Sequence, residues 1–238
     1  MECYKKLYLW LIIPLVITQI GIFNYYWPKF STVSWEIHFH YWLVTFWYVL
    51  IIIQPYLAVN GKLPQHKTLG IFGFLLAGGI IFTGLSLLDI PLKIIANKDP
   101  NRPGPSDAFF YGTLIIEFVS IMVFMYAVIK SIVNRKNIHE HAWWLICSVF
   151  YMMMPAVGRG CILLIRHITG PENFNPIYVF ITSEFIYLTL LLIFAKKFGK
   201  FKHQATIIAL GLIVVRFLRI PLGASEPVQE FLKALIQW

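Results

Sequence analysis

The sequence predicts an all-α polytopic membrane protein, a bundle of seven transmembrane helices followed by a short C-terminal interfacial helix. Of its 238 residues, 58% are hydrophobic and 13% are charged, whereas soluble domains average about 45–50% apolar and about 25% charged residues. The apolar residues fall in blocks of about 20, the length that a helix needs to cross a hydrocarbon core of about 30 Å. No connection between the blocks is long enough for a second domain, so residues 1–238 are expected to form a single transmembrane domain.

Short polar segments with helix breakers separate the predicted spans, for example "NGKLPQHK" and "HITGPENFNP". The first block follows two lysines, as in a signal peptide, but continues into bulky aromatic residues without a small-residue cleavage site, which favours a retained span. After residue 222, apolar residues recur at helical spacing, a pattern typical of an amphipathic helix in the membrane interface. The predicted spans cover about residues 7–27, 36–59, 68–92, 107–130, 141–166, 176–195 and 204–222.

The net charge of +9 is concentrated in the connections between the apolar blocks, where Lys and Arg contact lipid headgroups and set the topology. More basic residues fall near residues 5–6, 62–67, 130–136 and 196–202 than in the alternate connections. This excess predicts a cell-membrane protein with a cytoplasmic N-terminus and an external C-terminus. No segment can supply a soluble basic face with stacking aromatic residues, so nucleic acid is excluded as a partner. The lipid bilayer and other membrane proteins are the expected partners.

Four ionisable residues lie at outer-to-middle depth in the predicted spans, and a charge at mid-bilayer costs roughly 2.5–3.5 kcal/mol on insertion scales. These residues are Glu117, Arg159, Glu184 and Arg216. Two acids and two bases at similar depth can neutralise one another if their helices adjoin, which indicates either a structural salt-bridge network or a substrate or proton site. A further outer polar layer is predicted near the ends of the spans. Its members are His38, His40, Asp89 and Asp107.

Three histidines, His66, His141 and His203, fall at the cytoplasmic ends of three different predicted spans. Neutral imidazoles from separate helices can hold haem iron, zinc or copper in a helix bundle. His139 cannot share an ion with His141 on a regular helix, because side chains two residues apart diverge by about 200°. The sequence therefore predicts a haem or transition-metal site at these three histidines, and contact with lipid headgroups is the alternative.

Two motifs carry a resemblance to known proteins: "HKTLG" at residues 66–70, and His141 with Trp144 and, eighteen residues after the histidine, Arg159. They resemble a broad, uncharacterised family of bacterial multipass membrane proteins, which implies a shared fold over about residues 38–216 and a place in a bacterial inner membrane. The span from His141 to Arg159 is also distantly similar to membrane proteins that assist the maturation of haem–copper oxidases. That likeness implies a redox or oxidase-assembly role.

Three functional classes follow from these residues. The first binds haem or a transition metal through the histidines and has a redox or oxidase-assembly role. The second is a transporter or proton-coupled carrier built on the Glu/Arg network, because intramembrane charges mark substrate and proton pathways. The third is a metal-dependent intramembrane hydrolase or transferase, although the sequence lacks the HExxH and GxSxG motifs of such enzymes.

Overall fold

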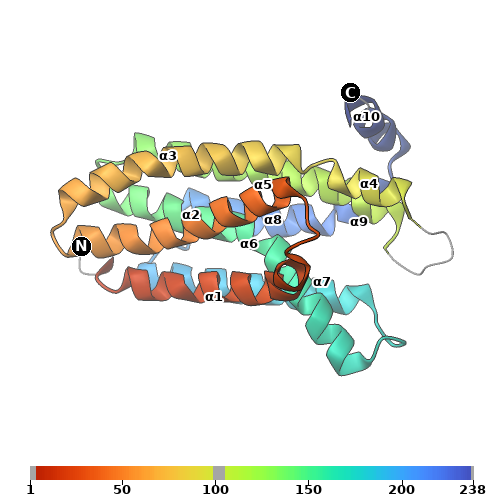
Figure 1. Cartoon of the computed structure of the whole chain (residues 1–238). Coiled ribbons are helices and arrows are strands. Elements are labelled where there is room, and N and C mark those ends of the chain that lie inside the picture. Colours follow the sequence, from red (N-terminus) through yellow and green to blue (C-terminus); the bar gives the residue numbers. More distant parts are fainter. Residues whose placement is uncertain (1–3, 99–104, 237–238) are drawn as a thin grey trace.

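The computed structural model describes residues 4–98 and 105–236, and every regular element in these ranges is a helix (Figure 1). The predicted all-α class is therefore confirmed. Most of the long helices run side by side along one direction, and α10 stands apart at one end. The elements are α1 (Leu7–Tyr26), η2 (Trp27–Lys29), α2 (Trp35–Val59), α3 (Leu63–Ser86), α4 (Ile90–Ala96), α5 (Asp107–Val133), α6 (Ile138–Thr169), α7 (Pro176–Phe198), α8 (Gln204–Phe217), α9 (Arg219–Ala224) and α10 (Glu226–Ile236).

Six helical segments of the described chain are long and apolar enough to cross a membrane, so the predicted count of seven is not confirmed. The seventh predicted span, residues 204–222, folds as two consecutive helices, α8 and α9, that meet at Leu218. The 14 residues of α8 rise about 21 Å at 1.5 Å per residue. This is less than the hydrocarbon thickness of about 30 Å. The six segments are Leu7–Lys29, Trp35–Val59, Leu63–Ala96, Asp107–Val133, Ile138–Thr169 and Pro176–Phe198.

Local capping accounts for helix ends that differ from the predicted ones. The helix α3 begins at Leu63 instead of near residue 68. A proline in its first turn favours this start, because the first backbone amides of a helix lack a partner within the helix and proline has no amide hydrogen. The helix α6 begins at Ile138, because the Asn137 side chain accepts hydrogen bonds from two backbone amides of the first turn. It ends at Thr169, before Gly170, whose φ of 77° suits glycine.

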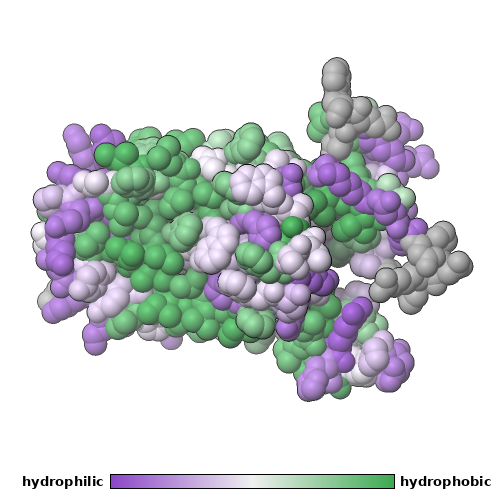
Figure 2. All heavy atoms as spheres, viewed as in Figure 1, coloured by the Kyte–Doolittle hydropathy of each residue, from purple (hydrophilic) through white to green (hydrophobic). Residues whose placement is uncertain are grey.

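On the face seen in Figure 2, apolar residues form a broad belt along the bundle, and polar residues gather at its two ends. Large apolar side chains are exposed on this belt, including Leu75 at 71% and Phe82 at 74% of their surface. Contiguous exposed apolar surface on this scale marks a membrane or protein contact. Together with the six long apolar helices, the belt places the protein in a lipid bilayer.

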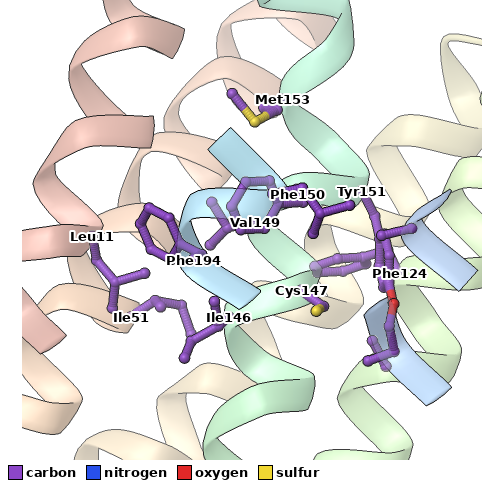
Figure 3. Packing of buried hydrophobic residues seen from close by; sticks show 14 of the residues in the cluster. Leu11, Ile51, Phe124, Ile146, Cys147, Val149, Phe150, Tyr151, Met153 and Phe194 are labelled. Carbon is purple, nitrogen blue, oxygen red and sulfur yellow. The ribbon is translucent and has the colours of Figure 1, made fainter. Parts of the chain in front are cut away.

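The helix α6 lies at the centre of the bundle and contacts α1, α2, α5, α7 and α8. Its buried Phe150 meets Phe194 of α7 edge to face, with ring centroids 5.3 Å apart, beside Leu11 of α1 and Ile51 of α2 (Figure 3). Such aromatic pairs contribute about 0.5–1.5 kcal/mol beyond the area that they bury. The core therefore fixes α6, which carries both His141 and Arg159, relative to its neighbours.

Glycines let two pairs of helices approach backbone to backbone, as is common in membrane helix packing. In the α1–α6 contact, Gly21 lies against the carbonyl of Ala156, and a Cβ atom there would overlap it. In the α5–α9 contact, Gly112 lies against the carbonyl of Arg219, and Gly223 lies against the carbonyl of Ala108. The second contact fixes the position of α9, and with it the Arg219 side chain.

The alternating helices give the bundle two ends. The amino-terminal end carries the connections at residues 60–62, 134–137 and 199–203, and the carboxy-terminal end carries residues 30–34, 87–89 and 170–175 together with α10. His66, His141 and His203 all lie at the amino-terminal end, in the first turn of α3, in the first turn of α6 and at the cap of α8.

Candidate functional site

A buried ion pair joins α7 to α8. Arg216 donates from Nε to Oε1 of Glu184 at 2.6 Å and from Nη2 to Oε2 at 2.8 Å, with the two residues 2% and 5% exposed. The guanidinium also lies over the ring of Tyr187, 4.4 Å from its centroid. A bidentate arginine–carboxylate pair is among the strongest hydrogen-bonded arrangements in proteins. Both carboxylate oxygens accept from the guanidinium, so Glu184 and Arg216 are direct partners with opposite charges.

Glu117 of α5 is arranged differently. Within the described residues it makes no hydrogen bond and no ion pair within 4 Å. It does interact electrostatically with Arg159 of α6 and Arg219 of α9. The Glu117 carboxylate thus has two cationic neighbours but no direct partner in the part of the chain that the structure describes.

The two arginines have hydrogen-bond donors to spare. Among the described residues, Nε of Arg219 is buried without a hydrogen-bond partner, and the guanidinium lies over Phe109, 4.9 Å from the ring centroid. Arg159 donates from Nη1 to the Pro155 carbonyl of its own helix at 3.0 Å. A guanidinium has five N–H donors, so both side chains can still bind an acceptor.

His40 of α2 adds a titratable group near Arg159. Its Nδ1 lies 2.9 Å from Oγ1 of Thr83, and that hydroxyl donates to the Gly79 carbonyl at 2.7 Å. Because a hydroxyl has one proton, the Nδ1 of a neutral His40 must donate to Thr83. Its Nε2 is then the acceptor and carries a free lone pair.

These residues form one group, which we call the charged cluster: His40, Glu117, Arg159 and Arg219. Its members come from α2, α5, α6 and α9, which are far apart in the sequence. A packing contact supports the grouping, because Gly84 lies beside both the His40 ring and Ile121, one turn after Glu117. The charged cluster can bind an acceptor through its arginines and take up a proton on its carboxylate or imidazole.

The rest of the predicted outer polar layer is dispersed. The Nδ1 of His38 is 2.8 Å from the Tyr26 hydroxyl, within a group of aromatic rings. Asp89 precedes α4 and pairs with Lys93 in that helix at 2.7 Å, and Asp107 pairs with Lys98 at 2.9 Å. Of the four predicted residues, only His40 therefore belongs to the charged cluster.

At the amino-terminal end, His66 and His141 adjoin each other with ring centroids 6.3 Å apart. His66 donates from Nδ1 to the Gln54 carbonyl at 3.2 Å, and His141 donates from Nδ1 to the Ser131 carbonyl at 3.0 Å. Carbonyl acceptors of this kind fix the tautomer that leaves Nε2 unprotonated. We call these two residues the His66–His141 pair.

His203 is engaged elsewhere. Its Nδ1 accepts the backbone amide of Ala205 at 3.0 Å and caps α8, while Nε2 donates to Glu140 at 3.0 Å. Burial lowers the pKa of His203, and the neighbouring Glu140 carboxylate opposes that shift. With both nitrogens engaged, His203 has no lone pair for a metal. Within the described ranges, no group of three or more His, Cys, Asp or Glu side chains could hold a metal ion, so the structure does not support the predicted three-histidine site.

Sequence reasoning missed one member of the charged cluster, Arg219, and one residue that orients His40, Thr83. Arg219 lies inside the last predicted span, but the helix break at Leu218 separates it from Arg216, so regular helical spacing does not place its side chain. Thr83 carries no charge and gives no signal in an apolar span. Its role depends on contact between α2 and α3.

The fold and the charged cluster define a multipass helical membrane protein with ionisable residues inside its bundle. No family model matches the chain, and searches of curated proteins and of solved structures found no match either.

Proposed function

We propose that the protein is a proton-coupled membrane carrier that binds its substrate at the charged cluster. One observation carries this proposal: Glu117 lies near Arg159 and Arg219 without a direct partner in the described chain, whereas Glu184 and Arg216 neutralise each other completely. Among the described residues, the same bundle thus contains one direct ion pair and one carboxylate that has cationic neighbours but no direct partner. Ionisable residues that face the interior of a membrane bundle usually mark substrate or proton pathways.

Each member of the charged cluster has a role in this proposal. Arg159 and Arg219 bind the substrate through their unused donors, and Glu117 carries the coupled proton. His40 is held by Thr83 with Nε2 free, and it exchanges a proton near Arg159. Binding and protonation are linked because both change the charge of the same small volume, where charges interact strongly at low dielectric.

The proposal predicts solute-driven proton flux that depends on Glu117. The purified full-length chain is reconstituted into vesicles loaded with a pH-sensitive dye, and monocarboxylates, dicarboxylates, phosphate, amino acids and amines are added outside in turn. We expect at least one solute to change the internal pH at least tenfold faster than in protein-free vesicles. Glu117→Gln is expected to abolish this flux, because the amide cannot carry the proton.

The matched control is Asp89→Asn, which neutralises an acid that pairs with Lys93 outside the charged cluster. It is expected to keep the flux of the unmodified protein. Absence of flux with every solute, or full flux in Glu117→Gln, would show that the charged cluster is not a proton-coupled transport site.

The His66–His141 pair favours a second candidate, a two-histidine haem or transition-metal site with a redox or oxidase-assembly role. The supporting observation is that both Nδ1 atoms donate to carbonyls, the usual outer hydrogen bond of a metal-binding histidine. This candidate also agrees with the proposed likeness of the span from His141 to Arg159 to membrane proteins that assist the maturation of haem–copper oxidases. An optical spectrum and metal analysis of the purified protein test it: we expect a Soret band or about one bound metal ion, lost in His141→Ala and kept in His203→Ala.

The proposed topology has seven crossings, with α8 and α9 together forming the last, α10 in the interface, a cytoplasmic N-terminus and an external C-terminus. Single cysteines replace Asn97 and Asn60, which are exposed at the carboxy-terminal and amino-terminal ends, in a background without other cysteines. An impermeant thiol reagent added to intact cells is expected to label Asn97→Cys, and to label Asn60→Cys only after lysis. The reverse pattern would invert the orientation.

A further inference from the structure

We propose that the substrate of the charged cluster is an anion with one negative charge, specifically a molecule bearing a single carboxylate. This inference rests on the proposed function and names the chemical class that the site binds. It follows from the charge of the cluster, from its free hydrogen-bond donors and from the aromatic rings that flank it.

The charge of the cluster favours a monovalent anion. Glu117 contributes −1, Arg159 and Arg219 contribute +1 each, and neutral His40 contributes nothing, which leaves +1. The Glu184–Arg216 ion pair adds zero. A buried charge without a counter-charge is costly. One negative charge on the ligand makes the group neutral, a dianion leaves −1, and a cation raises the excess to +2.

The free N–H donors of the two arginines favour a carboxylate as the ligand group. The buried Nε of Arg219 has no acceptor in the described chain, and Arg159 donates only within its own helix. The guanidinium fork matches the two oxygens of a carboxylate. A bound carboxylate would therefore accept hydrogen bonds from the arginine N–H groups that have no acceptor in the described chain.

Aromatic rings flank the two guanidinium groups and favour an apolar body on the ligand. Arg219 lies over Phe109, and Arg159 lies 6.0 Å from the ring centroid of Tyr25. A carboxylate with a small apolar or aromatic group can bind the arginines and contact such rings at the same time. Benzoate and butyrate are accordingly suitable probes.

Ligand-induced stabilisation tests the inference in the full-length chain purified in detergent. A ligand that binds only the folded state raises the melting temperature with its concentration. We expect saturable increases of several degrees with benzoate or butyrate, and none with benzamide, which has the same shape but no charge. Succinate and phosphate are expected to give less than a tenth of the affinity. Oleate, offered in mixed micelles, distinguishes a lipid carboxylate from a free solute.

Two variants test ligand binding separately from a structural role of the same side chains. Arg219→Lys keeps the charge but loses the fork, so we expect at least tenfold weaker benzoate binding in a folded protein. Glu117→Gln raises the site charge to +2, so we expect its preference to shift at least tenfold from benzoate toward succinate. Benzoate binding by a protein without proton flux would refute the carrier and leave the ligand class standing.

Stabilisation by oleate alone would support the carboxylate assignment and identify its source as a lipid. Three results would overturn the assignment: equal stabilisation by benzamide and benzoate, tighter binding of phosphate or succinate by the unmodified protein, or no stabilisation by any carboxylate.

Discussion

Glu184→Gln is expected to destabilise the protein strongly, by about 3–5 kcal/mol in the free energy of unfolding, because it leaves the Arg216 charge buried without its counter-charge. Arg216 is 2% exposed, and the described residues offer no other acid within 4 Å of it. The pair also joins α7 to α8, so its loss is expected to loosen the helix that leads into α9. Thermal unfolding in detergent measures this effect.

A double-mutant cycle measures the interaction energy between Glu184 and Arg216 apart from their contacts with other residues. Replacing both Glu184 and Arg216 by glutamine removes both charges, and we expect the double variant to be clearly more stable than the sum of the two single losses implies. Asp89→Asn serves as the control, because exposed ion pairs contribute little. Additive losses in the cycle would mean that the two side chains do not stabilise each other.

Gly223→Ala is expected to be the second most damaging change, costing about 1–3 kcal/mol through overpacking. A Cβ atom at this position would overlap the Ala108 carbonyl and lie 2.6 Å from the Gly112 amide nitrogen. Backbone atoms cannot move aside as a flexible side chain can, so α9 must shift away from α5. Because α9 carries Arg219, we also expect proton flux and benzoate binding to fall.

The matched control is Gly211→Ala in α8, where a Cβ atom would meet nothing within 4 Å. Alanine favours helix over glycine by about 1 kcal/mol, so this variant is expected to be at least as stable as the unmodified protein. Equal melting temperatures for Gly223→Ala and Gly211→Ala would contradict the close α5–α9 contact.

Much of the fold could be predicted from the sequence because a bilayer constrains a helix by length and composition. The helices over residues 7–26, 107–133 and 176–198 correspond to predicted apolar blocks. The last block was less predictable, because hydropathy does not register the helix break at Leu218. Local caps were underestimated in the same way: Asn137 and Pro64 start their helices earlier than the apolar pattern indicates.

The candidate site was only partly predictable, since residue type and depth do not specify a partner. Glu184 and Arg216 were expected to be near other charges, but only the helix arrangement pairs them and leaves Glu117 open. His203 resembles His66 and His141 in its place at a helix start. Its two hydrogen bonds, to Ala205 and Glu140, depend on the conformation of the α7–α8 connection and on contact with α6.

The most direct test of the central claim is whether a small anion reaches the interior beside Glu117. Thr113 lies one turn before Glu117 on the same face of α5 and is partly buried. In a background without native cysteines, Thr113→Cys in membranes is expected to react with a small hydrophilic thiol reagent, and benzoate is expected to slow that reaction at least fivefold. A cysteine that does not react, or one whose rate benzoate leaves unchanged, would contradict a ligand site at the charged cluster.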